Sequence, residues 1–504
     1  MPWTLLFLLL QAQSPGTLEL RVTSEGKATA ARVYLIDSSG HGQRIPGAVS
    51  YTRREEMNST IDGSASVTLL PGRYRVRAEK GMEYRKAGQD VEIRPGETAS
   101  ITLDIPRFSD LNQQGWYSGD LHNHRSPDEM PLLARAEDLN VAPVITRHVG
   151  GRGRTGNEPF PERDLIPIDA THIVSLHNQE VERLFAGHGA VVLLNAPHAV
   201  MAPKSDLFPM DLDYCREARR DGAFIDAEKP IWKNVPVNVA FGVIDTIGVI
   251  NNHFHPEDVW ADGEKYGSLP QDGPQDKPVY RTPAGFAQWM MDLYYSFLNC
   301  GFRIPVSAGS ASGVMTSWPG YERVYVHLDG AFSYENWFRG LKAGHGFATN
   351  GPILLVAANG KLPGSEFAWK KPMDVALGIE ANSQDLVDRV EIVLNGVVLR
   401  TIGVGKREFH DVVRVKMEHP GWLAVRCFEP AGVTIRYAHT SPFWFTQNGR
   451  LPVKKSDAQR WADYVRDLAA SVDAALYPSR EDYEKAQQVF REASQIYLRL
   501  AEGN

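Results

Sequence analysis

The first hundred residues alternate between apolar and polar positions. Leu18, Leu20 and Val22 fall on one side of a period-two pattern, and the later runs are separated by turns such as Pro71-Gly72. Consecutive side chains of a β-strand point to opposite faces, so this alternation predicts strands that are buried on one side. We therefore expect residues 17–106 to form a small antiparallel β-sandwich.

One run in this region carries a resemblance to known modules. The run Leu70–Val76 (Leu-Pro-Gly-Arg-Tyr-Arg-Val) resembles transthyretin or carboxypeptidase regulatory-like modules.

From residue 115 the pattern changes to short apolar runs that alternate with helical stretches. One run, at 144–146, ends at Arg147 and His148, and a later helix opens with Thr282 as N-cap and Pro283 at its first position. Repeated strand–helix units predict a parallel sheet, and five or more of them predict a closed barrel. Residues 115–352 are therefore expected to form a β/α barrel with polar residues at the carboxyl ends of its strands.

Strand alternation returns after the expected barrel. The hairpin dipeptide Asn395-Gly396 lies between two such runs, and residues 353–447 are predicted to form a second β-sandwich. The tail, 456–502, has helical periodicity that is broken at 478–479, with Ser456 as the expected cap of its first helix. The fold class is thus multidomain α/β plus all-β: a distorted barrel flanked by two β-sandwiches, with a C-terminal helical hairpin.

The N-terminus and the bulk composition limit the location and the partners. Residues 1–16 contain an apolar run that is too short to span a bilayer and resembles a compact signal peptide, which predicts a secreted or periplasmic protein; the alternatives are a misassigned start or a disordered tail. A net charge of −7 gives no basic footprint, so we expect no nucleic-acid partner. We expect no integral membrane segment, and the oligomeric state is left open.

Histidines are concentrated in the middle of the chain. Nine of the 15 lie between residues 122 and 255, where even spreading would place roughly four. His122 and His124 are two apart in the run Gly119–His124, so at the end of a short strand both rings would point to the same side. Histidine is the commonest metal ligand, and this pattern favours a metal site over a polar strand end.

Several runs resemble PHP-type metallohydrolases of the carbaryl-hydrolase-like (CehA/McbA) branch. They are Trp116–His124, Asp226–Trp232, Asn251–His253, Val324–Leu328 and Phe347–Pro352. The resemblance implies a distorted, TIM-like β/α barrel of about seven strands that binds one to three divalent ions for hydrolysis.

The resemblance also assigns metal ligands. His122 and His124 match the first motif, His148 is kept beside Arg147 where the family has an Asp, Glu180 matches a bridging carboxylate, and His188 matches the next histidine. The match then departs from the family, because Lys229-Pro230 stands for His-Pro and Ala311 and Gly313 replace the Asp and His of the closing motif. His148, Glu228 or His253 would then substitute as ligands, and one or two ions, with Zn or Mn expected, would replace a full set.

Two functions follow from this set of residues. In the first, a metal-activated water hydrolyses a phosphoester, ester or carbamate of a small molecule or polymer, with Glu228 as general base and Lys229 or Arg147 at the oxyanion. Glu228 and Lys229 could equally form a surface ion pair at a loop. In the second, a degenerate, non-catalytic PHP barrel binds a carbohydrate or a surface polymer.

Overall fold

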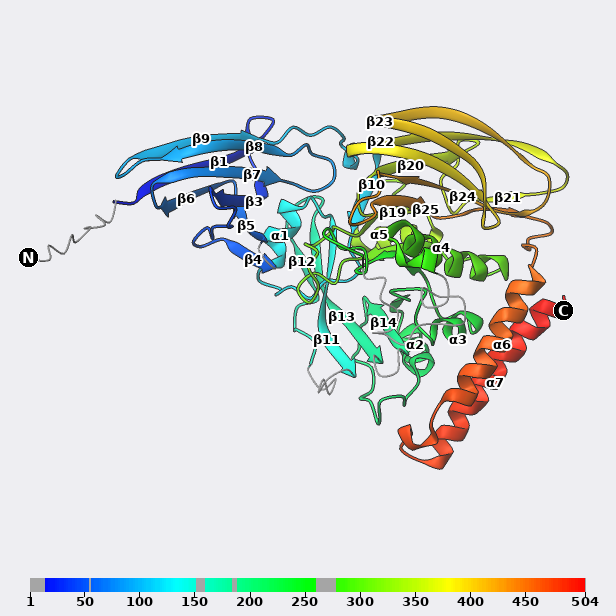
Figure 1. The fold of residues 1–504 in the computed structure, drawn as a ribbon. Helices are drawn as coiled ribbons and strands as arrows, with labels where there is room; N and C mark the ends of the chain where they lie inside the picture. The colour runs from blue at the N-terminus through cyan, green and yellow to red at the C-terminus, as the bar shows by residue number, and fades with distance from the viewer. Residues whose placement is uncertain (1–13, 54–55, 151–158, 184–187, 260–277, 504) are drawn as a thin grey trace, which may run out of the picture. The chain divides into compact units, whose positions relative to one another are not determined.

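The computed structural model describes residues 14–53, 56–150, 159–183, 188–259 and 278–503. Most of the predicted signal peptide, residues 1–13, lies outside the described residues. The chain divides into two compact units, the first made of residues up to Ser109 together with Arg135–Glu137 and the second of the remainder (Figure 1). It is a β-rich, multidomain protein.

The first unit contains two sheets. One holds β2 (Lys27–Ala28), β1 (Gly16–Ser24), β6 (Ser64–Leu69) and β9 (Thr98–Asp104); the other holds β4 (Val49–Arg53), β5 (Glu56–Asp62), β3 (Ala30–Asp37), β7 (Gly72–Glu79) and β8 (Ala87–Ile93). Leu18, Leu20 and Val22 are buried between them, as the alternation predicts. The prediction of a purely antiparallel sandwich is wrong in one pairing, since β1 runs parallel to β9.

In the second unit seven strands are joined by hydrogen bonds into a ring. They are β10 (Trp116–Gly119), β11 (Val141–Gly150), β13 (Ile173–Arg183), β14 (Gly189–Leu194), β15 (Phe224–Asp226), β16 (Ile247–Asn251) and β17 (Val306–Gly309). A bridge between Asp226 and Thr246 links β15 to β16, and the amide of Leu121 closes the ring by donating to the carbonyl of Ala308. The core of this unit lies around the buried helix α4 (Pro283–Asn299).

The predicted all-parallel sheet is wrong at β14. β14 runs antiparallel to both β13 and β15, whereas β10, β11 and β13 are parallel to one another. β13 ends at Arg183 and β14 begins at Gly189. So short a connection joins antiparallel neighbours, because a parallel crossover needs a dozen or more residues.

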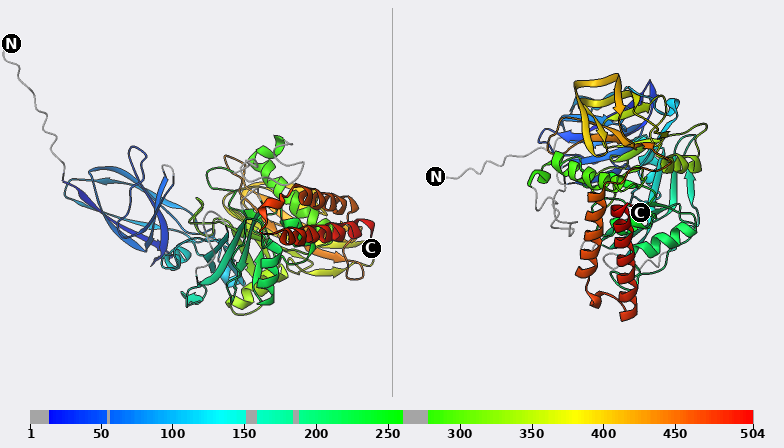
Figure 2. Two further views of the ribbon diagram at one scale, coloured as in Figure 1. Left: turned by 90° about the horizontal axis from the view of Figure 1, so that it is seen from below. Right: turned by 90° about the vertical axis from the view of Figure 1, so that its right-hand side faces the viewer.

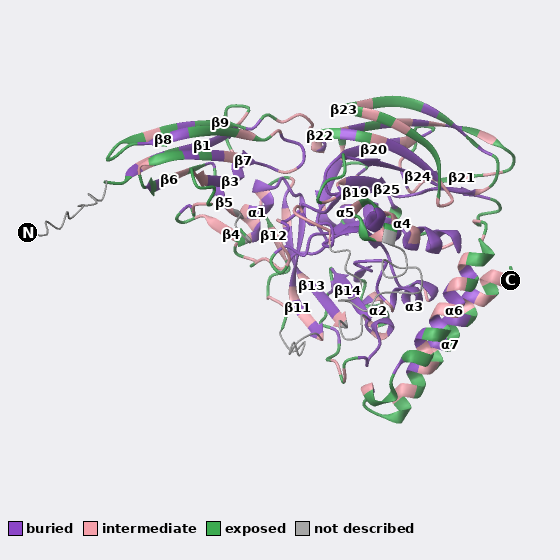
Figure 3. Cartoon of the chain, viewed as in Figure 1, coloured by how far each residue is buried: buried purple, intermediate pink, exposed green. Residues whose placement is uncertain are grey.

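Five strands of the ring, β10, β11, β13, β14 and β15, belong to one sheet. This sheet continues from β10 into the C-terminal strands. Its further members are β12 (Leu165–Pro167), β18 (Arg323–His327), β19 (Gly346–Thr349), β20 (Ile353–Ala358), β21 (Glu366–Ala368), β22 (Met373–Leu394), β23 (Val397–Met417), β24 (Gly421–Phe428), β25 (Tyr437–Thr440) and β26 (Phe443–Thr446). The hairpin at Asn395-Gly396 is confirmed, since Leu394 pairs with Val397 and both turn residues have positive φ. β24 is buried, whereas β23 is mostly exposed (Figure 3).

Helices fill the remaining connections. They are α1 (Met130–Ala136), α2 (Asp211–Arg220), α3 (Val235–Ala240), α5 (Tyr334–Ala343), α6 (Lys455–Ser471) and α7 (Arg480–Glu502), with the 3-10 turns η1 (Asn112–Gln114), η4 (Pro278–Arg281) and η5 (Ala474–Leu476). The Thr282 cap of α4 is confirmed, because its hydroxyl accepts from the amide of Gly285. Ser456 as the cap of the tail is wrong: α6 begins at Lys455 after Lys454, so Ser456 lies inside the first turn.

The two tail helices lie side by side (Figure 2). Trp461 of α6 stacks on Phe297 of α4, with ring centroids 4.5 Å apart, and the hydroxyl of Tyr497 donates to the carbonyl of Pro236. The tail therefore packs on the second unit through its aromatic stripe. Among the described residues, no helix combines the length and the apolar character that crossing a membrane requires.

Candidate metal centre

Four side chains from three neighbouring strands converge on one point. His122 and His124 follow β10, and His148 of β11 stands directly opposite Glu180 of β13 in the parallel register. Nε2 of His122 lies 2.8 Å from Nε2 of His124, and Nε2 of His148 lies 2.8 Å from Nδ1 of His124. The ligand atoms of His122, His124 and Glu180 all lie within 4.8 Å of one another, so these three side chains could hold a metal ion.

The carboxylate of Glu180 faces this cluster from one side. Its Oε1 is 3.5 Å from Nε2 of His122, and its Oε2 is 3.4 Å from Nε2 of His124 and 3.6 Å from Nε2 of His148. Two ligands about 2.1 Å from a tetrahedral ion lie about 3.4 Å apart, which is the spacing of the oxygen and nitrogen atoms here. Glu180 is only 3% exposed, and within the described residues its buried Oε2 has no hydrogen-bond partner. A cation fits this position, because a buried carboxylate oxygen needs a positive or donating partner.

The ionisable groups of the cluster shift one another's pKa values. Burial alone would lower the pKa of His122, but the carboxylates of Glu180 and Glu228 outweigh burial and raise that pKa to about 10. Burial opposes the ionisation of Glu180, yet His122 and His124 hold its pKa below the usual range. Without a metal the buried site is therefore neutralised by a proton on an imidazole, and a metal ion would take the place of that proton.

Glu228 lies behind His122 rather than beside Glu180. Its Oε1 is 3.2 Å from Nδ1 of His122, a contact without hydrogen-bond alignment, and it forms an ion pair with the ammonium of Lys229. The indole N–H of Trp232 donates to Oε2 of Glu228 over 3.0 Å, and the Lys229 ammonium lies 5.0 Å from the Trp232 ring centroid. Glu228 and Lys229 are buried, so a surface ion pair is wrong for this pair.

The loop of the degenerate closing motif packs against the backbone of the two histidines. The amide of His124 donates to the carbonyl of Ser312 over 2.7 Å. Gly313 has φ +107°, and a Cβ there would lie 2.7 Å from the carbonyl carbon and oxygen of His124. A side chain at this position would clash with the backbone, so the loop brings no ligand from position 313.

A buried aspartate fixes the strand end that carries the histidines. The carboxylate of Asp120 accepts from the backbone amides of His122, Ser310 and Gly320 and from the hydroxyl of Ser310. Asp120 therefore orients the backbone of His122. Among the described contacts, the carboxylate facing the His122 ring on its outer side is Glu228.

The cluster does not include three other predicted site residues: Arg147, His188 and His253. Arg147 precedes His148 and faces the opposite side of β11, where it donates to Oε1 of Gln179 over 2.6 Å and to the carbonyl of Val200 over 3.0 Å. A role for Arg147 at an oxyanion beside Glu180 therefore has no support in this geometry.

The two remaining predicted histidines, His188 and His253, have other contacts. Nδ1 of His188 is 3.1 Å from Oδ1 of Asn234, and the ring of His253 stacks on Phe286 with centroids 6.0 Å apart. Sequence reasoning missed the contact of Trp232 with Glu228, although Trp232 closes the run Asp226–Trp232 that carries part of the resemblance.

The comparisons with known proteins give no family. No protein-family model and no curated protein match this chain. Among solved structures, it is similar to GBS52, the minor pilin of Streptococcus agalactiae (18% identity, 20% of this chain and 47% of that chain, TM-score 0.16), and to a streptococcal ancillary pilin (14% identity, 32% and 43%, TM-score 0.14). It is also similar to the Bacillus anthracis TIE protein (11% identity, 86% and 49%, TM-score 0.15). The chain spans less than half the length of these structures, and scores so low carry no argument about its fold or activity.

Proposed function

We propose that this protein is a metal-dependent hydrolase of the PHP type, with one divalent ion held by His122, His124 and Glu180. The observation that carries this proposal is the buried Oε2 of Glu180, which has no hydrogen-bond partner among the described residues and faces two imidazole nitrogens. The ring of seven strands supports it, because Glu180 lies on β13 and the two histidines follow β10, so that the ligands belong to strands of that ring as they would in a PHP barrel. Three protein ligands leave a coordination position for water, as in catalytic zinc sites.

The chain's own residues divide the remaining tasks. A divalent ion would supply Lewis acidity and lower the pKa of a coordinated water toward neutrality. His148 is the most accessible member of the cluster, with 19% of its side chain exposed, and we assign it proton transfer to and from the substrate. Glu228 faces the outer nitrogen of His122, so we assign it the orientation of that ring in place of the general-base role expected from the sequence.

The substrate class follows from this chemistry and from the resemblance. A cation that polarises a phosphoryl or carbonyl oxygen suits a phosphoester, ester or carbamate. Zn or Mn suits two imidazoles and one carboxylate. The apolar run at the N-terminus makes secretion or periplasmic export part of the proposal.

Metal content of the purified protein tests this function. Mass spectrometry in a buffer without chelator should find about one divalent ion per chain, and a value below about 0.3 would reject the metal site. Glu180→Gln and His122→Ala should each lose the ion. His41→Ala is the matched control, since the side chain of His41 is 74% exposed and lies in the first unit.

Activity is then measured on a panel of p-nitrophenyl phosphodiesters, esters and carbamates. We expect hydrolysis to depend on the added ion and to be lost in His122→Ala, while His41→Ala keeps it. Equal rates for His122→Ala and the unaltered protein would remove the cluster from catalysis.

A second candidate is a non-catalytic barrel that binds a carbohydrate or a surface polymer. The packing of Gly313 against the backbone of His124 favours it, because the closing loop supplies no ligand from that position. A protein that holds one ion per chain, hydrolyses nothing in the panel and binds an immobilised polysaccharide would support this alternative.

A further inference from the structure

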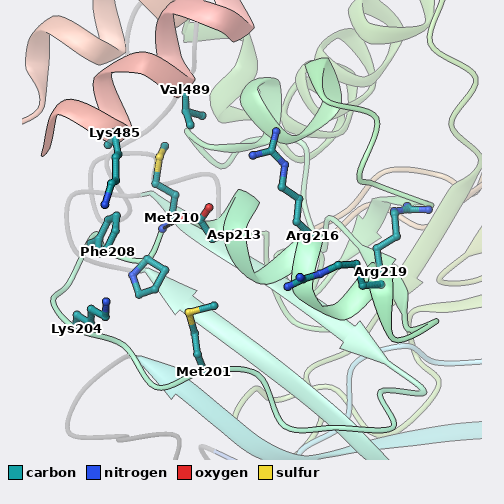
Figure 4. Close-up of a pocket in the computed structure, with 12 residues that line it drawn as sticks. Met201, Lys204, Phe208, Met210, Asp213, Arg216, Arg219, Lys485 and Val489 are labelled. Carbon is teal, nitrogen blue, oxygen red and sulfur yellow. Dashed lines mark hydrogen bonds between the residues drawn. The ribbon is translucent and has the colours of Figure 1, made fainter. Parts of the chain in front are cut away.

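A cavity of about 800 Å³ lies in the second unit, away from the metal cluster. Its walls come from the segment 201–210, from α2 and from the first half of α7 (Figure 4). The apolar part is formed by Met201, Phe208, Met210 and Val489, and Phe208 and Met210 are buried. This volume is in the range of pockets that enclose a small molecule.

The polar part of the cavity is strongly cationic. Its lining carries five basic side chains and one carboxylate: Lys204, Arg216, Arg219, Arg220, Lys485 and Asp213. The carboxylate is used locally, because it accepts from the amide of Met210 over 3.0 Å at the start of α2. The local excess of positive charge contrasts with the net charge of −7 of the whole chain.

Two of the arginines are held in place by contacts outside the cavity. Arg219 donates to Oδ1 of Asp245 over 3.0 Å and to the carbonyl of Val243 over 2.8 Å. The guanidinium of Arg216 lies 4.8 Å from the ring centroid of Phe241, and within the described residues Arg216 forms no ion pair. Figure 4 shows Lys485 and Lys204 on the side of Phe208, with Arg216 and Arg219 on the other side. Lys485 has an acidic partner outside the cavity lining, since its Nζ lies 2.8 Å from Oε1 of Glu481, as Arg219 has in Asp245. The lining still carries more cations than these pairs and Asp213 neutralise, and an anion in the cavity would compensate the excess.

We propose that this cavity is a binding site for an amphipathic anion. The apolar body of the ligand lies on Phe208, Met210 and Val489, and its carboxylate, sulfonate or phosphate group lies among the basic side chains, with Arg216 and Lys485 on opposite sides. Guanidinium groups recognise such oxyanions through paired hydrogen bonds. A neutral or cationic amphiphile gains the apolar contact but does not compensate the excess positive charge of the lining. The site is independent of the proposed hydrolysis, since none of its lining residues belongs to the metal cluster.

The probe is 1-anilinonaphthalene-8-sulfonate, an aromatic sulfonate whose fluorescence rises in apolar surroundings. Titration of the full chain should give saturable binding at one site per chain. The double variant Arg216→Ala/Lys485→Ala should weaken binding about tenfold or more, because it removes two charge-assisted contacts. Arg491→Ala is the matched control: Arg491 is an exposed cation of the same helix α7 outside the cavity lining, and its loss should change the affinity less than about twofold.

Val489→Asp tests the apolar wall from the other direction. It places a carboxylate against the bound anion and should also abolish saturable binding of the probe. The circular dichroism spectrum and the metal content should stay those of the unaltered protein. Unchanged affinity in both the double variant and Val489→Asp would overturn the proposal.

Competition identifies the anionic group and checks that charge matters. Decanoate and decyl phosphate should displace the probe, and the tighter of the two tells whether the ligand is a carboxylate or a phosphate ester. Decanol and decyltrimethylammonium should not displace it at the same concentration. Equal displacement by decyltrimethylammonium would show a purely apolar surface and would reject the proposal.

Discussion

Lys229→Met tests the structural role of the buried Glu228–Lys229 pair. Lys229 and Glu228 are 2% and 5% exposed, and the ammonium is ion-paired with the carboxylate above the ring of Trp232. Removal of the ammonium leaves a buried carboxylate with the indole N–H of Trp232 at 3.0 Å and the ring of His122 at 3.2 Å. Loss of one partner of a buried pair costs about 3–5 kcal/mol of the free energy of unfolding.

The double variant Lys229→Met/Glu228→Gln should be far less damaging than the two single changes together. Glutamine keeps an acceptor for Trp232, and methionine fills most of the volume of the lysine, so we expect a loss of about 1–3 kcal/mol. The single losses would sum to about 6–10 kcal/mol, which leaves a coupling free energy of about 6 kcal/mol between the two side chains.

Urea unfolding followed by far-ultraviolet circular dichroism measures these losses. The transition of the first unit is an internal reference, because both substitutions lie in the second unit. Lys416→Met is the matched control: this lysine pairs with Glu418, both side chains are more than half exposed, and its loss should change stability by less than about 0.5 kcal/mol. Additive losses in the double variant would refute the view that the two charges neutralise each other.

The same variants report on the proposed orientation of His122. If Glu228 positions that ring, Glu228→Gln should weaken zinc binding by about 10–100-fold without removing a ligand, as loss of a carboxylate behind a ligating histidine does. Competition with a zinc-sensitive fluorescent chelator measures this change. Unchanged zinc affinity would return Glu228 to the general-base role expected from the sequence.

Two further predictions concern the second unit. Burial alone would lower the pKa of His172, but contacts with Asp138 and a second aspartate raise it to about 9, so protonated His172 stabilises the fold below its unfolded pKa and this contribution is lost as pH rises through 9. The stability difference between the unaltered protein and His172→Gln, from urea unfolding at pH 6 and pH 10, should therefore shrink by about 3 kcal/mol, and a constant difference would contradict this assignment. Gly313→Ala should cost about 2 kcal/mol more than Gly360→Ala, because both glycines have positive φ but the added Cβ contacts the backbone of His124 only at position 313; equal thermal unfolding shifts would contradict that clash.

The features that the sequence predicted well are those with short-range causes. The turn at Asn395-Gly396 needs two residues with positive φ, and Thr282 supplies the hydroxyl that an exposed helix amide requires. Both effects act within four residues. The pair His122 and His124 belongs to the same class, since two residues two apart on an extended segment share a face.

The features that the sequence did not show depend on pairing between distant segments. The register of β11 against β13 is irregular between Pro143 and Arg147, and such an irregularity changes which side each later side chain faces. It decides that His148 faces Glu180 while Arg147 faces Gln179. The strands predicted for a separate barrel and sandwich likewise form one continuous sheet, because β10 pairs with β18 and the pairing continues through β19 and β25.

The balance of charge at the cluster favours one ion per chain. The side chains around His122 include two buried carboxylates, Glu180 and Glu228, and the ammonium of Lys229 already neutralises the second. One divalent ion beside Glu180 would leave the buried group with a single excess positive charge, whereas two ions would leave three. Uncompensated charge in a buried site is costly. Two features therefore act against a second ion: Lys229 stands where a histidine is expected, and the closing loop supplies no ligand at Gly313. A stoichiometry near two in the unaltered protein would contradict this reasoning, while Lys229→His, which removes the ammonium and adds a ligand, is the variant in which a second ion should appear.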